Sequence, residues 1–298
     1  MIYYFLPDIG IFGGVKVACQ LADILNSLQV PVSVAFPKGQ APDWFPFSAP
    51  VLSDAEACSA LGQSDWAILT WPPDHERLAQ LPGRRIIHAQ GTDPLMNPLF
   101  ADRSALVLTC WSFATDYARR LGAEPIEIGI SISPRFYFQH QEKLINRVAY
   151  MPRRGYATVR ACMRTCPGLD FAPIEGMDET ATAALMQNSG IFLATAQGEQ
   201  FGLPALEAMA AGCLVLSVPV VGGMEYLHHR TNCLVAEPDD IPHILAEAMR
   251  PENRARNERL RAAGLATAWR YHPAHQRRRL AALLDNGLAK LRRHRDGS

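Results

Sequence analysis

The stretch that decides the fold is residues 189–212, which reads SGIFLATAQGEQFGLPALEAMAAG. Its first part, residues 189–195, is an apolar run that predicts a buried strand ending in a loop of small residues. The part after Leu203 predicts a helix, because Pro204 stands in the first turn, good helix formers follow, and Gly212 closes the segment. The stretch therefore predicts a strand, a short loop and a helix in succession.

Two carboxylates, Glu199 and Glu207, flank the start of this helix. Glu199 lies on the loop beyond the carboxyl end of the predicted strand, and Glu207 follows in the first or second turn of the helix. The backbone N–H groups between them lie at a helix N-terminus, which attracts an anion such as a diphosphate. The stretch therefore predicts a site in which two carboxylates hold sugar hydroxyls on either side of a pyrophosphate.

Short apolar runs alternate with helical patterns along the whole chain. Predicted strands cover residues 3–6, 31–36, 66–70, 85–88, 105–109, 126–130, 147–151, 169–174, 190–194, 213–218 and 232–236. Predicted helices include residues 14–27, 112–121, 158–166, 180–187 and 204–211. Such alternation predicts an α/β protein with parallel sheets that are covered by helices on both faces.

A polar stretch without a clean period, residues 134–146, separates two such series. The predicted domains are therefore residues 1–138 and 139–274. The remaining segment, residues 275–298, predicts a basic amphipathic helix that could pack back on the first domain.

Composition excludes several classes of protein. The formal net charge is zero, so no bulk electrostatic attraction favours nucleic acid. The seven cysteines form no C-x-x-C pair, which predicts reduced thiols and no metal site. No apolar run approaches the roughly twenty residues of a membrane span, and the start lacks a signal-peptide pattern, so we expect a cytoplasmic protein. The basic surplus from Arg250 onward indicates either a solvated helical surface or contact with an anionic membrane.

Two features of the first domain are candidate binding elements. Gly13 and Gly14 follow the first predicted strand and open the first helix, where glycine lets the backbone approach a ligand. Their spacing is not that of the dinucleotide-binding fingerprint, and a tight turn without a ligand is the alternative. His88 ends the fourth predicted strand, so it could bond a sugar hydroxyl or phosphate, or be an ordinary core residue.

Arg153 and Arg154 follow the first predicted strand of the second domain and precede Gly155. Guanidinium groups stay charged and donate two parallel hydrogen bonds to phosphate oxygens. The pair is therefore a candidate pyrophosphate clamp, and two solvent-exposed arginines on a turn are the alternative.

The segment 178–225 resembles the donor-binding half of retaining glycosyltransferases of the large family-four type, which have the GT-B fold. The motifs that carry the resemblance are EQFGLP from Glu199, EAMAAG from Glu207, and the pair Gly222-Gly223. The run YMPRR, ending at Arg154, is similar to a bacterial polysaccharide-type subgroup. The resemblance implies two Rossmann-like β/α/β domains that face each other across a cleft.

In that family the first Glu of the pair faces the donor sugar and the second usually binds the nucleotide ribose. The resemblance assigns these roles to Glu199 and Glu207, and it assigns the diphosphate to amides near Phe201, Gly202 and Leu203. Gln200 stands where the family often has glycine, inside the same binding segment.

The resemblance implies transfer of a sugar, with retention of configuration, from a nucleotide-diphosphate-sugar to a glycan, lipid-linked or small-molecule acceptor on the first domain. We expect no cofactor and no essential metal, since the chain has no Asp-x-Asp motif. Two alternatives stay open, a GT-B epimerase or phosphorylase, and a non-catalytic subunit that binds nucleotide-sugar.

Overall fold

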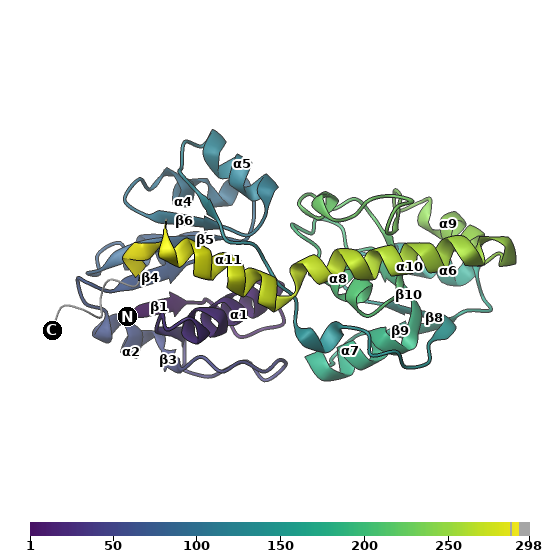
Figure 1. The fold of residues 1–298 in the computed structure, drawn as a ribbon, viewed down its shortest axis with the longest axis horizontal. Helices are drawn as coiled ribbons and strands as arrows, with labels where there is room; N and C mark the ends of the chain where they lie inside the picture. Colours follow the sequence, from purple (N-terminus) through teal and green to yellow (C-terminus); the bar gives the residue numbers. More distant parts are fainter. Residues whose placement is uncertain (287, 292–298) are drawn as a thin grey trace. The chain divides into compact units, whose positions relative to one another are not determined.

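The computed structural model describes residues 1–286 and 288–291. Its contacts divide the chain into two compact units. Unit 1 comprises residues 1–131 and the chain from Pro273 onward, and unit 2 comprises Ile132–His272. The structure thus divides the chain at 131/132 and 272/273, whereas the sequence predicts boundaries at 138/139 and 274/275. Both units are α/β, as the alternation of apolar and helical patterns predicts (Figure 1).

Unit 1 is built on a seven-stranded parallel sheet in the order β3-β2-β1-β4-β5-β6-β7. The strands are β1 (Ile2–Phe5), β2 (Val32–Phe36), β3 (Val51–Ser53), β4 (Trp66–Leu69), β5 (Arg84–Ala89), β6 (Leu106–Thr109) and β7 (Ile126–Glu127). The helices are α1 (Gly13–Ser27), α2 (Asp54–Ala60), α3 (Pro72–Leu78), α4 (Asn97–Ala101), α5 (Ser112–Arg120) and α11 (Pro273–Asp285).

Both faces of this sheet are buried. Side chains of β1 alternate between two hydrophobic clusters, with Ile2 and Tyr4 in one and Tyr3 and Phe5 in the other. Burial on both faces explains why these strands read as continuous apolar runs and not as alternating ones. The sequence did not predict β3, because this strand has only three residues, two of them apolar, and so forms no apolar run.

The last described helix, α11, packs along α1 in unit 1 (Figure 1). Leu280 and Leu284 of α11 lie in the same buried cluster as Ile24 of α1. Gln276 accepts a hydrogen bond from Ser131 Oγ at 2.6 Å and donates one to the Gly129 carbonyl at 2.8 Å. Part of the predicted basic segment, residues 292–298, lies outside the described residues.

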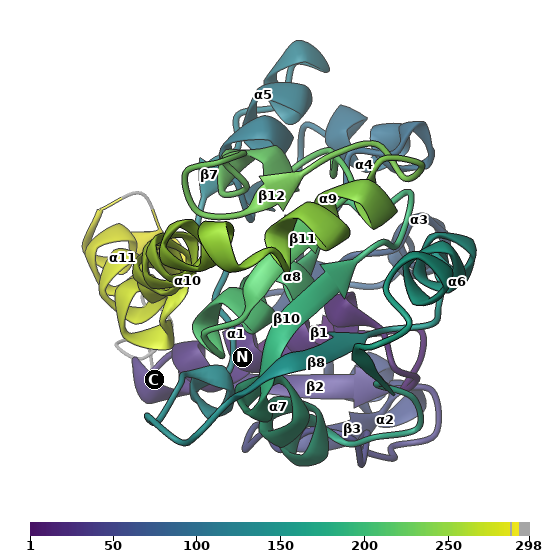
Figure 2. The same cartoon turned by 90° about the vertical axis from the view of Figure 1, so that its right-hand side faces the viewer.

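Unit 2 is built on a five-stranded parallel sheet in the order β12-β11-β10-β8-β9. Figure 2 labels the first four of these strands. The strands are β8 (Leu144–Tyr150), β9 (Asp170–Pro173), β10 (Ser189–Ala194), β11 (Leu214–Ser217) and β12 (Leu234–Val235). The helices are α6 (Tyr156–Thr165), α7 (Glu179–Asn188), α8 (Leu203–Ala210), α9 (Ile241–Ala248) and α10 (Arg254–Ala268). The strand and helix predicted from residues 189–212 are β10 and α8.

No helix among the described residues is long and apolar enough to span a membrane.

Candidate functional site

The predicted arginine pair and Glu199 lie together at the carboxyl ends of two neighbouring strands of unit 2. β8 and β10 pair in parallel, so the loops that follow them leave the same edge of the sheet. Arg154 Nη2 donates a hydrogen bond to Glu199 Oε1, and the two side chains form an ion pair. The amide of Gln197 also donates to the Arg154 carbonyl at 2.8 Å. The two loops are therefore joined by a side-chain bond and by a backbone bond.

Gly155 permits this close approach of the two loops. A Cβ atom added to Gly155 would lie 2.2 Å from the carbonyl oxygen and 2.5 Å from the carbonyl carbon of Thr195. The backbone of Thr195 therefore leaves no space for a larger residue at this position. The preceding Arg154 has φ 54°, a left-handed conformation that is uncommon outside glycine. The arginine pair is thus held in a tightly constrained turn.

The loop before α8 presents an open helix N-terminus beside this ion pair. Gly202 is the N-cap residue, has φ 79°, and provides no side-chain cap for the first turn. In that turn Pro204 has no N–H and the Ala205 amide donates to the Gly202 carbonyl at 3.1 Å, so the turn can offer an anion the Leu203 amide and the helix dipole. Leu203, the first residue of α8, is partly exposed. The predicted binding segment therefore places a helix N-terminus without a side-chain cap at the same sheet edge as Arg154.

Buried aromatic residues fix the shape of this loop. Tyr226 Oη donates a hydrogen bond to the Gly202 carbonyl at 2.6 Å. The ring of Phe201 is buried and lies 5.2 Å from the ring of Tyr226 and 5.9 Å from that of Tyr271. The amide of Gly222 donates to the Gln200 carbonyl at 2.6 Å. Phe201 thus serves the predicted site by anchoring the backbone, while its side chain belongs to the core of unit 2.

Glu207 lies in the second turn of α8 and is buried, with 5% of its surface exposed. Burial raises the pKa of Tyr226 well above its usual value, and the charges of Tyr271, Cys233, Glu199 and Glu207 add to the shift. Both carboxylates therefore lie within electrostatic reach of one tyrosine. This geometry brings Glu199, Glu207 and the first turn of α8 into one region of unit 2.

In unit 1 the predicted His88 is wholly buried and is bonded on both ring nitrogens. Gln90 Nε2 donates to Tyr4 Oη at 3.2 Å, and Tyr4 Oη lies 2.6 Å from His88 Nδ1. The Tyr4 hydroxyl thus shares a hydrogen bond with Nδ1, and Nε2 shares one with Cys110 Sγ at 3.0 Å. A ligand contact through His88 itself requires one of these two bonds to break.

Gln90 is the polar end of this chain of hydrogen bonds, and sequence reasoning missed it. It follows β5, is half-buried, and lies against the start of α1, since a Cβ added to Gly14 would be 2.5 Å from Gln90 Oε1. Gly14 therefore gives room to the Gln90 carboxamide. The sequence could have indicated Gln90, because His88 is the last residue of the predicted strand 85–88 and Gln90 lies in the loop after it, where a side chain can reach a ligand.

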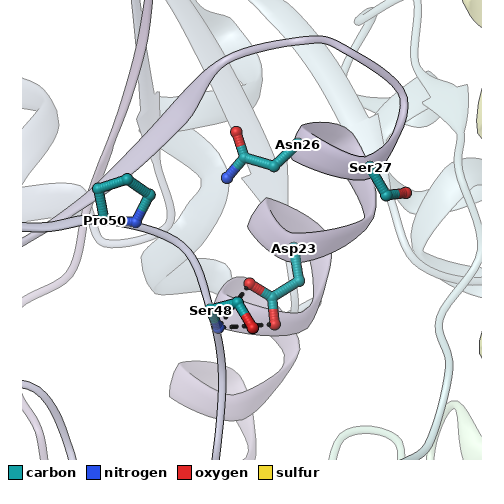
Figure 3. A pocket seen from close by; sticks show the side chains of 5 residues that line it. All are labelled: Asp23, Asn26, Ser27, Ser48 and Pro50. Carbon is teal, nitrogen blue, oxygen red and sulfur yellow. Dashed lines mark hydrogen bonds between the residues drawn. The ribbon is translucent and has the colours of Figure 1, made fainter.

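A shallow pocket on unit 1 is a structural feature and not part of this site (Figure 3). Asp23 accepts hydrogen bonds from the backbone N–H groups of Ser48 and Ala49, at 2.7 to 3.1 Å. Asn26 bonds both the N–H and the carbonyl of Val32. The pocket lies at the carboxyl-terminal half of α1, whereas Gly13 and Gly14 lie at its start.

The buried imidazole of His88 predicts how the stability of the folded protein depends on pH. Burial lowers the pKa of His88 from its usual 6.5 to about 3. The unfolded chain therefore binds a proton below pH 6.5 that the folded protein binds only near pH 3, so stability falls as pH drops through this window. In the wild type, this proton should lower the free energy of unfolding by up to about 2 kcal/mol between pH 7.5 and 5. His88→Gln should remove this part of the decrease.

Urea unfolding followed by tryptophan fluorescence measures this effect, because four of the five tryptophans lie in unit 1. His243→Gln, which removes an exposed histidine from α9, is the matched control and should keep the wild-type pH dependence. An unchanged pH dependence in His88→Gln would contradict the neutral, buried state of His88.

Solved structures with the same architecture define the class of fold. HepE (Alr3699) of Anabaena in complex with UDP aligns with a TM-score of 0.71 and 14% identity, covering 95% of this chain and 99% of that chain. Sucrose-phosphate synthase from Thermosynechococcus elongatus aligns with a TM-score of 0.72 and 13% identity, covering 97% of this chain and 99% of that chain. WaaG, a glycosyltransferase involved in lipopolysaccharide biosynthesis, aligns with a TM-score of 0.68 and 13% identity, covering 96% of this chain and 100% of that chain. The chain thus has the α/β fold of GT-B glycosyltransferases, with two Rossmann-like domains on parallel sheets.

Within this class, residues 160–251 match the family model described as "Glycosyl transferases group 1". The matched segment contains Glu199, the first turn of α8 and Glu207, and it begins after Arg153 and Arg154. No curated protein matches the chain.

Proposed function

We propose that this protein is a glycosyltransferase that transfers a sugar from a nucleotide-diphosphate-sugar to a hydroxyl acceptor with retention of configuration. The observation that carries the proposal is the ion pair of Arg154 and Glu199 beside the uncapped N-terminus of α8, which also bears Glu207. A cation, a carboxylate and a helix N-terminus without a side-chain cap at one sheet edge match the charges of a sugar diphosphate. The match of residues 160–251 to a glycosyltransferase family model supports the same activity.

Arg153, Arg154 and the amides from Phe201 to Leu203 are proposed to hold the diphosphate. They would stabilise the negative charge that develops on the leaving group, and that charge stabilisation is the main contribution to the rate. Donation from guanidinium groups to phosphate oxygens is also a strong, directional interaction. In this scheme the leaving phosphate itself takes the proton of the acceptor hydroxyl, and no covalent nucleophile is assigned.

Glu207 is proposed to bind the ribose hydroxyls, and Glu199 the transferred sugar. Glu207 suits a fixed contact, because it is buried on a helix. Glu199 suits a contact that changes during the reaction, because it lies on the loop and is paired with a partly exposed arginine. Gln200 lies between Glu199 and the anchored Phe201 and is proposed to border the donor.

Unit 1 is proposed to bind the acceptor. Gly13 and Gly14 open α1 beside the Gln90 carboxamide, which can accept a hydrogen bond from a hydroxyl group. For His88 we propose an indirect role, in which Tyr4 and His88 hold the Gln90 carboxamide in one orientation. The protein is proposed to act in the cytoplasm without a cofactor.

Metal independence gives one prediction. Activity should survive an excess of EDTA, since arginines and backbone amides neutralise the diphosphate in this scheme. Initial rates with and without the chelator measure this. Loss of activity that Mg²⁺ or Mn²⁺ restores would contradict the assignment of the clamp.

The experiment that tests the proposed function combines binding and turnover. Calorimetric titration with UDP, the nucleotide present in the HepE complex, probes the unit 2 site. Release of UDP from UDP-sugars in the presence of candidate acceptors then tests transfer. Binding without turnover would favour the non-catalytic subunit, and rearrangement of the sugar without transfer would favour the epimerase.

Glu207→Gln is expected to weaken UDP binding by about 1.5–3 kcal/mol, because a charge-assisted hydrogen bond to the ribose becomes a neutral one or is lost. Calorimetric titration measures the change. Glu247→Gln is the matched control, since it removes a carboxylate of α9 that pairs with Arg256 at 2.7 Å. UDP affinity that is unchanged in folded Glu207→Gln would exclude the ribose role.

A further inference from the structure

Two consecutive glycines, Gly222 and Gly223, let the chain after β11 pass close to the loop before α8. The Gly222 amide donates a hydrogen bond to the Gln200 carbonyl at 2.6 Å. A Cβ atom added to Gly223 would lie 2.7 Å from the carbonyl oxygen of Phe201, so a larger residue has no space here. The glycine pair therefore meets two successive carbonyl groups of the loop.

Tyr226 meets the next carbonyl group in the same loop. Its hydroxyl donates to the Gly202 carbonyl at 2.6 Å, and that oxygen also accepts from the Ala205 amide at 3.1 Å. A carbonyl group has no proton to donate, so the phenol is the donor, and burial raises the pKa of Tyr226 well above its usual value and keeps that proton in place. The peptide unit between Gly202 and Leu203 is thus fixed on its carbonyl side.

The geometry of this peptide unit connects Tyr226 to the anion site. In a planar trans peptide unit the C=O and N–H groups point in opposite directions. While Tyr226 holds the Gly202 carbonyl, the Leu203 N–H is therefore directed to the other side of the loop. The Leu203 amide is the one that the first turn of α8 can offer to an anion, because Pro204 has no N–H and the Ala205 amide is bonded to Gly202.

Tyr226 is itself held by the core of unit 2. The buried Asn232 donates from Nδ2 to the Tyr226 carbonyl at 2.7 Å and to Thr267 Oγ1 of α10 at 2.9 Å. The rings of Phe201 and Tyr271 lie 5.2 Å and 6.0 Å from the ring of Tyr226. The position of the hydroxyl is therefore set by packing and hydrogen bonds within unit 2.

We infer that Tyr226 is a positioning residue for the donor, which directs the Leu203 amide at the diphosphate by holding the Gly202 carbonyl. This role rests on the proposed function, because it requires a diphosphate at the start of α8. The phenol acts through the peptide unit and does not touch the ligand. Its contribution should therefore appear in binding of the diphosphate and in turnover, and not in binding of the nucleoside.

Tyr226→Phe tests this role, since it removes the hydroxyl and keeps the ring. UDP affinity should fall about tenfold, because the Leu203 amide is no longer held toward the diphosphate. The kcat should fall with it, since the same amide stabilises the leaving group. Uridine, titrated as a competitor of UDP, should bind the variant as tightly as the wild type. A general disturbance of α8 would weaken uridine as well, because Glu207, the proposed ribose ligand, lies on that helix.

Tyr137→Phe is the matched control. Tyr137 is also buried in unit 2, and its hydroxyl donates to the Ala268 carbonyl at 2.9 Å. Each variant thus loses one bond from a buried phenol to a backbone carbonyl, and we expect similar decreases in stability in thermal unfolding. Tyr137→Phe should keep wild-type UDP affinity and turnover.

Three results would overturn the role of Tyr226. Wild-type UDP affinity in Tyr226→Phe, equal losses of UDP affinity in Tyr226→Phe and Tyr137→Phe, or equal losses for UDP and uridine in Tyr226→Phe would each assign the hydroxyl to the stability of unit 2 alone. A wild type that does not bind UDP would refute the proposed function and this role together. A wild type that binds UDP without transferring a sugar would refute the activity only, and the titrations would still decide the role of Tyr226.

Discussion

Glu199→Gln is expected to lower turnover by roughly 10²–10³-fold, the usual cost of removing one group that stabilises developing charge. Bare UDP should bind this variant as tightly as the wild type, or more tightly. The reason is the ion pair with Arg154, in which the Glu199 carboxylate lies against the arginine proposed to hold the diphosphate. A neutral amide at this position competes less for the guanidinium group.

Arg154→Ala should behave differently, weakening UDP binding and turnover together, because the clamp touches both the donor and the product. Calorimetric titration and initial rates on the two variants and the wild type separate the two roles. A Glu199→Gln variant that loses UDP affinity as strongly as Arg154→Ala would show that Glu199 binds the nucleotide and not the sugar.

The central strands, such as β1, β4, β10 and β11, could be predicted because they are buried on both faces and therefore read as short apolar runs. The predicted segments 66–70 and 190–194 correspond to β4 and β10. β3 was not predicted, since its three residues, Val51-Leu52-Ser53, include only two apolar ones and form no apolar run. Burial of both faces is thus the physical source of the sequence signal.

The same burial limits what a strand residue can do. The sequence places His88 at the end of a strand, where a ligand contact is expected. In the structure β5 extends to Ala89, so His88 is inside the doubly covered sheet and bonds Tyr4 and Cys110. Gln90, two residues later, is the one that leaves the sheet. One residue of strand length decides which side chain can reach a ligand.

The ion pair of Arg154 and Glu199 could not be predicted from the sequence without knowing the order of the strands in the sheet. The two residues are 45 positions apart, and β9 lies between their strands in the sequence. In the sheet, however, β8 pairs with β10 on one side and with β9 on the other. The sequence identified both residues as candidates, but it contains no local signal that their strands are neighbours.

Gly155→Ala is expected to destabilise unit 2 by roughly 1–3 kcal/mol, as overpacking in a close contact does. It should also weaken UDP binding by about tenfold or more, because the clamp would be displaced. The added methyl group would lie 2.2 Å from the Thr195 carbonyl oxygen. Backbone atoms cannot rotate away, so the loop after β8 must move from the end of β10. That movement would carry Arg154 away from Glu199 and strain the bond from the Gln197 amide to the Arg154 carbonyl.

Gly168→Ala is the matched control, since it adds the same methyl group to unit 2 at a position with nothing within 4 Å. It should keep wild-type stability and UDP affinity in thermal unfolding and calorimetric titration. The two glycines thus separate the effect of a methyl group from the effect of moving the two loops apart. Wild-type UDP affinity in Gly155→Ala would therefore mean that the diphosphate does not depend on the contact between the β8 and β10 loops.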